Sequence, residues 1–179
     1  RSVFTELQEE GYLFDNITEL PGMGVWLADV AAPSSFNITE ARQGVIDVVG
    51  SNRAQVDLNH IYAAGATVAS AGPGMSPRSA LRFPNDTHEM SLRIGMIDSE
   101  VDLTHPAFAG SHVQTRSFVA ESAEKPNFHG TAIASIIAAD NTDYVGLAPR
   151  TDLFAASVFE KDPEQGEIAS TLSLIKALD

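Results

Sequence analysis

From Leu92 onward, short apolar runs alternate with stretches of helical character. Strands are expected over 93–97, near 113–119 and near 152–158, and helices from about 129 and near 168–178. Strands that alternate with helices form a parallel sheet covered on both faces. Ligands of such sheets bind at the carboxyl ends of the strands. The pattern therefore predicts an α/β domain whose functional site lies at one edge of the sheet.

Two side chains stand where such a site is expected. In "RIGMIDSEVDLTHPAF", the apolar run Ile94–Ile97 ends at Asp98, and in "FHGTAIASIIAA", His129 opens an apolar helix. The positive end of a helix dipole favours neutral imidazole, which is the form that a general base needs. A carboxylate at a strand end can orient such a ring, so Asp98 and His129 are predicted to pair. The alternative is that Asp98 is merely solvated and His129 merely caps its helix.

Residues 1–65 have the pattern of a small α+β unit. Val3, Phe4 and Leu7 share one helical face, and a second helix with Ile38, Ala41, Val45 and Val48 on one face is expected after a cap at Ser34 or Ser35. Strands are expected over 12–17, 23–30 and 54–58, which gives the order αββαβ. Residues 66–92 are rich in Gly, Ala, Ser and Pro, which favours a linker or an irregular surface arm.

The composition excludes several classes of partner. Acidic residues outnumber basic ones by 24 to 11, and the net charge of −13 argues against nucleic acid and against anionic membrane surfaces. Cysteine is absent, which excludes disulfides, thiol catalysis and cysteine-ligated zinc. No apolar run approaches the length needed to cross a membrane.

Three segments, "IGMIDSEVDLTHPAF", "HGTAIASIIAA" and "VGLAP", resemble subtilisin-like serine peptidases in their order and spacing. The resemblance implies that 93–179 is the amino-terminal part of a subtilisin-like parallel-sheet domain. It also implies that Asp98 and His129 are two members of a catalytic Asp-His-Ser triad that hydrolyses peptide bonds in protein or peptide substrates. Glu100 departs from the family, which has glycine after Asp-Ser.

Residues 1–65 are similar to the ferredoxin-like propeptide of that family, with "QVDLNHIYAAGA" as its tail. The resemblance implies a zymogen in which propeptide and catalytic domain contact each other within one chain. It also implies secretion or export to the periplasm, with a signal peptide upstream of Arg1. By analogy, the processing bond is expected between Tyr62 and Thr67.

The family's nucleophile lies in a G-T-S motif, which does not occur in these 179 residues. The serine is therefore expected beyond Asp179, and the chain by itself is predicted to be inactive. Apolar residues of an interrupted sheet are expected to be covered by a dimer partner, by the propeptide or by a downstream portion; they are Ile94, Met96, Leu153 and Phe154. No cofactor is predicted, since the short "DNTDY" segment gives no clear calcium site.

Two other functions stay open. A non-catalytic propeptide-like inhibitor or interaction module, or a degenerate protease, is favoured by Glu100 and by the missing serine motif. A more remote alternative is a phosphotransferase that uses Asp98 as its nucleophile, although no P-loop accompanies it. The sequence downstream of Asp179 discriminates between the protease and the module.

Overall fold

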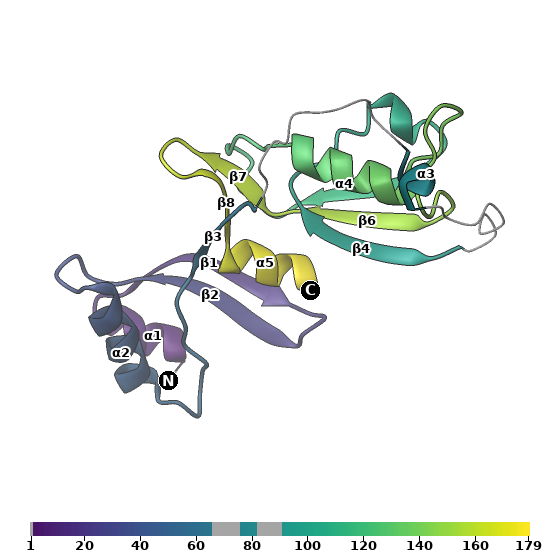
Figure 1. Cartoon of the computed structure of the whole chain (residues 1–179). Helices are drawn as coiled ribbons and strands as arrows, with labels where there is room; N and C mark the ends of the chain where they lie inside the picture. The colour runs from purple at the N-terminus through teal and green to yellow at the C-terminus, as the bar shows by residue number, and fades with distance from the viewer. Residues whose placement is uncertain (1, 66–75, 82–90) are drawn as a thin grey trace. The chain divides into compact units, whose positions relative to one another are not determined.

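A computed structural model describes residues 2–65, 76–81 and 91–179. Most of the predicted arm over 66–92 lies outside the described residues. The chain divides into two compact units, Arg1–His60 with Asp179, and Ile61–Leu178. Figure 1 labels their helices and strands.

The first unit is built from α1 (Val3–Glu9), β1 (Leu13–Leu20), β2 (Val25–Ala31) and α2 (Ile38–Val49). The two strands form an antiparallel ribbon. Its core consists of buried side chains from both helices and from the start of the ribbon, namely Leu7, Tyr12, Val45 and Val49. The predicted order αββα is thus present.

The N-cap of α2 is Asn37, so the predicted cap at Ser34 or Ser35 is wrong. The Asn37 side chain accepts the backbone N–H groups of Thr39 and Glu40, and Glu40 accepts the N–H of Asn37 in return. This reciprocal capping box satisfies amides that the first turn would otherwise leave unpaired. The two serines lie in the turn just before it.

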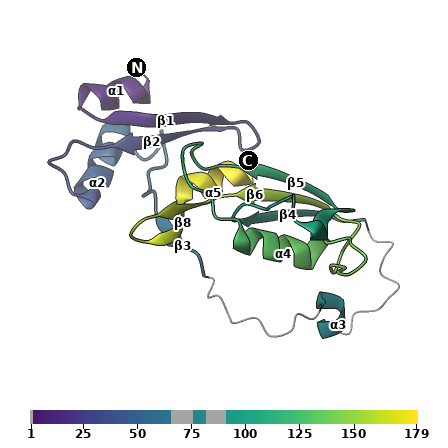
Figure 2. The same cartoon turned by 90° about the horizontal axis from the view of Figure 1, so that it is seen from above.

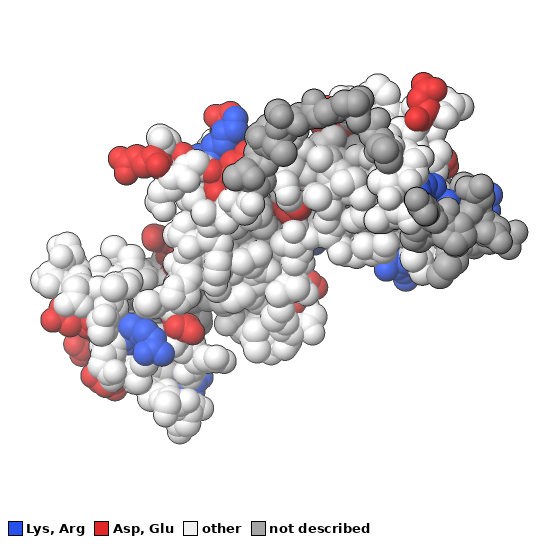
Figure 3. Space-filling model, in the orientation of Figure 1, with Lys and Arg blue, Asp and Glu red and all other residues white. Residues whose placement is uncertain are grey.

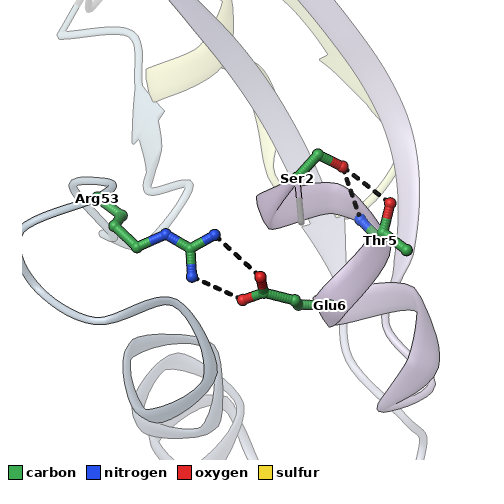
Figure 4. A network of polar contacts seen from close by, with 4 residues as sticks. All are labelled: Ser2, Thr5, Glu6 and Arg53. Carbon is green, nitrogen blue, oxygen red and sulfur yellow. Dashed lines mark hydrogen bonds and ion pairs between the residues drawn. The ribbon is translucent and has the colours of Figure 1, made fainter.

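The predicted strand over 54–58 is also wrong, because this segment pairs with no strand in the part of the chain that the structure describes. Its side chains do alternate in burial, and Ala54 and Val56 pack against the core. Arg53 fixes the segment's start through a two-pronged ion pair with Glu6 of α1, at 2.6 and 3.1 Å (Figure 4). The alternation of apolar residues therefore indicated which side chains face the core. It did not show that the backbone pairs with another strand.

Replacing Tyr12 with phenylalanine is expected to stabilise the first unit by about 1 kcal/mol, because the buried Tyr12 hydroxyl has no hydrogen-bond partner among the described residues. Burial, followed by the charges of Asp47 and Glu10, raises the pKa of Tyr12. The unfolded chain therefore ionises first as the pH rises, and wild type should lose stability above about pH 10 where the variant does not.

Urea unfolding followed by the fluorescence of Trp26, the only tryptophan, measures this unit within the whole chain. Tyr144→Phe, in the second unit, is the matched control. A lower midpoint for Tyr12→Phe would mean that the hydroxyl makes a stabilising contact.

The second unit contains the predicted parallel sheet, which is confirmed. Its strand order is β4 (Arg93–Asp98), β6 (Asp152–Ser157) and β5 (His112–Ser117). The helix α4 (Phe128–Ala138) lies along one face of this sheet (Figures 1 and 2). Met96 and Leu153 are buried within this unit, whereas Phe154 remains 43 % exposed. Ile94 is partly buried against the same core, so the expectation of uncovered apolar residues fails for Ile94, Met96 and Leu153 and fits Phe154.

A second, antiparallel sheet has the order β3 (Ile61–Ala63), β8 (Gly166–Ser170) and β7 (Phe159–Asp162). β8 occupies the start of the helix predicted over 168–178, so the helix α5 begins only at Thr171 (Thr171–Leu178). Residues 61–63 were assigned from the sequence to the first unit (1–65), yet as β3 they pair with β8 of the second.

Candidate active site

The strand β4 ends at Asp98, whose backbone and side chain both accept hydrogen bonds. Asp98 is paired with Ser157 of β6, and its carbonyl accepts the N–H of Val158 at 3.0 Å. Its carboxylate accepts the N–H of Ser99 through Oδ1 at 2.6 Å. The carboxylate is thus fixed at the carboxyl end of a parallel strand, where the sequence placed the site.

The amino end of α4 is capped from another loop. Asn127 gives no side-chain cap, and the N–H of Gly130 donates instead to Oγ of Ser99 at 2.7 Å. The Ser99 side chain is buried, so its hydroxyl contacts the N–H of Gly130 rather than solvent. Sequence reasoning gave Ser99 no role, and its only signal was a small hydroxyl residue directly after the strand-terminal aspartate.

This arrangement brings the two predicted side chains into contact. Nδ1 of His129 lies 2.7 Å from Oδ1 and 3.0 Å from Oδ2 of Asp98. The Asp98 side chain is 13 % exposed and that of His129 is 41 % exposed, so the carboxylate is sheltered and the ring is accessible. A carboxylate at Nδ1 favours the tautomer with hydrogen on Nδ1, which leaves the lone pair of Nε2 to accept a proton.

The helix and the turn after β4 approach so closely that only glycine fits at position 130. A Cβ there would lie 2.3 Å from the carbonyl oxygen of Ser99 and 2.7 Å from that of Glu100. Gly130 therefore lets α4 approach the backbone of the turn that follows Asp98. Glu100 itself is held by its N–H, which donates to the Pro126 carbonyl at 2.9 Å.

An open pocket of about 650 Å³ lies beside α4 and includes neither Asp98 nor His129. Its wall combines Phe128 and Ala132 of the helix with Asp102, Asp143 and Tyr144 of two loops. Hydrogen bonds from the side chain and backbone of Thr104 lower the pKa of Asp102. Within residues 2–65, 76–81 and 91–179, no three His, Cys, Asp or Glu side chains gather as a metal site would require.

The subtilase family profile matches residues 90–178, which include both Asp98 and His129. Residues 90–178 belong to the subtilase family. Subtilases are serine peptidases, so the family places this segment among the hydrolases. They are typically secreted, and none of the described helices is long and apolar enough to span a membrane. A search of curated proteins finds no match to the chain.

Proposed function

We propose that the chain is the amino-terminal part of the zymogen of a subtilisin-like serine endopeptidase. The observation that carries this proposal is the 2.7 Å contact between Nδ1 of His129 and Asp98 inside the segment that matches the family. The nucleophilic serine would be supplied by sequence beyond Asp179, and residues 1–179 by themselves would not hydrolyse peptides. Export would follow from a signal peptide upstream of Arg1.

In the proposed reaction, Nε2 of His129 takes the proton of the serine hydroxyl as its oxygen attacks the peptide carbonyl. The proton then passes to the leaving amine, and water repeats the sequence to release the acyl group. Asp98 stabilises the imidazolium that exists between these transfers and keeps Nδ1 protonated. Both carboxylate oxygens lie within 3.0 Å of Nδ1, which suits this role.

The segment after the first unit supports the zymogen part of the proposal. Ile61–Ala63 pairs antiparallel with β8, and Ala64 extends the ladder by donating its N–H to Glu167 O at 3.0 Å. An extended peptide added to the edge of a sheet is a common mode of peptide binding. We therefore propose that 1–65 acts as a propeptide, that 61–64 lies in the substrate path, and that the processing bond falls between Tyr62 and Thr67.

Expression of the complete gene tests this proposal. The mature protein is expected to begin within 63–67, and His129→Ala is expected to abolish that cut, because no other group would deprotonate the serine. Amino-terminal sequencing of the secreted product measures both. A start near Arg82, or a start that His129→Ala leaves unchanged, would contradict self-processing. A stop codon directly after Asp179 would favour the inhibitor or interaction module.

A further inference from the structure

The last four carbonyls at the carboxyl end of α4 are held by groups from outside the helix. Such carbonyls have no partner within a helix and must find one elsewhere. Here they accept hydrogen bonds from Leu147 N–H to Ile136 O (2.8 Å), Ala148 N–H to Ile137 O (2.7 Å), Ser111 Oγ–H to Ala138 O (2.6 Å) and Gly146 N–H to Ala139 O (2.8 Å). The segment over 146–148 therefore caps the helix that carries His129.

Arg78 donates hydrogen bonds to the carbonyl groups of this capping segment. It belongs to α3 (Pro77–Leu81), and its Nε–H donates to Gly146 O at 2.7 Å while Nη2–H donates to Leu147 O at 3.0 Å. The carbonyl of Gly146 and the N–H of Leu147 are one peptide group, and the next peptide group joins Leu147 to Ala148. Each group thus receives a hydrogen bond from the guanidinium and passes one to α4.

Two consecutive peptide groups therefore connect the Arg78 guanidinium to the carboxyl end of α4 through hydrogen bonds. Hydrogen bonds in such a chain polarise one another, and bonds from a charged donor are the stronger ones. The positive charge also stands at the negative end of the α4 dipole. Gly146 lets the segment approach, since a Cβ there would lie 2.7 Å from Ile137 O.

We propose that Arg78 is a positioning residue for His129, acting through residues 146–148 and α4. The helix is rigid, with the relay at its carboxyl end and the Ser99 and Asp98 contacts at its amino end. Resting on the proposed function, this makes 76–81 a part of the catalytic half that stays attached after a cut between Tyr62 and Thr67.

Amide hydrogen exchange on the 179-residue chain tests the relay without any need for catalysis. In Arg78→Ala, the amides of Leu147 and Ala148 are expected to exchange at least about tenfold faster than in wild type, while those of β6 keep their rates. Arg150→Ala, an exposed arginine nearby, should change neither. Unchanged protection at 147–148, or equal acceleration throughout the unit, would overturn the relay.

Kinetics of the complete protease test the link to His129. Arg78→Ala is expected to lower kcat about tenfold with little change in KM, and millimolar guanidinium ion should restore part of the loss. A merely structural role predicts no such rescue, and neither wild type nor Arg150→Ala should respond to the ion. A normal kcat, or a loss that guanidinium leaves unrepaired, would overturn the positioning role. An inactive complete wild-type protein would instead refute the proposed function, and the exchange result would stand apart from it.

Discussion

Replacing Asp98 with asparagine in the complete protease is expected to lower kcat/KM by about 10⁴-fold. The reason lies in the two short distances from the carboxylate to Nδ1 of His129, 2.7 and 3.0 Å. Whichever way the asparagine amide is oriented, its NH₂ group takes one of these positions. That group is a donor, so it opposes hydrogen on Nδ1 and favours the tautomer that carries hydrogen on Nε2.

The backbone N–H of Ser99 fixes the orientation of the amide. It donates to Oδ1 of Asp98 at 2.6 Å, so this position must stay an acceptor in the variant. The NH₂ group then takes the Oδ2 position, 3.0 Å from Nδ1, and the amide oxygen left at the Oδ1 position, 2.7 Å from Nδ1, no longer carries the negative charge that stabilises an imidazolium. With hydrogen on Nε2, His129 cannot take the proton of a serine, and the loss should appear in kcat rather than in KM.

Asp102→Asn is the matched control, because it removes one carboxylate from the loop that directly follows Asp98. The carboxylate of Asp102 accepts hydrogen bonds from the N–H and the hydroxyl of Thr104. Its kcat/KM should stay within a few fold of wild type. Equal losses in both variants would show that net loop charge, rather than the tautomer of His129, sets the rate.

Gly130→Ala is expected to destabilise the second unit by about 3 kcal/mol and to lower kcat at least about 10²-fold. The new methyl carbon would lie 2.3 Å from Ser99 O and 2.7 Å from Glu100 O, and both oxygens are backbone. Because neither can rotate away, the amino end of α4 must move. This movement lengthens the bond from Gly130 N–H to Ser99 Oγ and separates His129 from Asp98.

Gly95→Ala is the control for this change, since its added Cβ would meet nothing within 4 Å. It lies in β4, which also carries Asp98, so it reports any general cost of alanine near the site. Thermal unfolding and kcat of the complete protease measure both variants. Wild-type kcat in Gly130→Ala would show that the contact between helix and turn does not position His129.

The sequence predicted the contact between Asp98 and His129 better than it predicted the first unit. Asp98 ends an apolar run and His129 opens an apolar helix. The local pattern around each residue therefore predicted that both lie at the same edge of the sheet. The cap at Asn37 was missed because Ser34, Ser35 and Asn37 are all good capping residues, and Glu40 in the third helical position selects Asn37.

Other features depend on contacts that no local pattern contains. The role of Ser99 follows from the distance between its Oγ and Gly130, which are 31 positions apart. β3 pairs with β8, which lies about a hundred residues later in the chain. The alternation over 54–58 therefore could not show that the paired strand is 61–63 instead. The relay from Arg78 to α4 likewise joins three separate segments.

The central position of β6 has a consequence for the order of events during synthesis. Among the described strands, both β4 and β5 pair only with β6, which comes last of the three along the chain. At translation rates of about 5–20 residues per second, β4 waits roughly 3–12 s before its neighbour has been made. Among the described residues, the core of the first unit extends no further than Val56, so it can fold on the ribosome while the second unit is still without its parallel sheet.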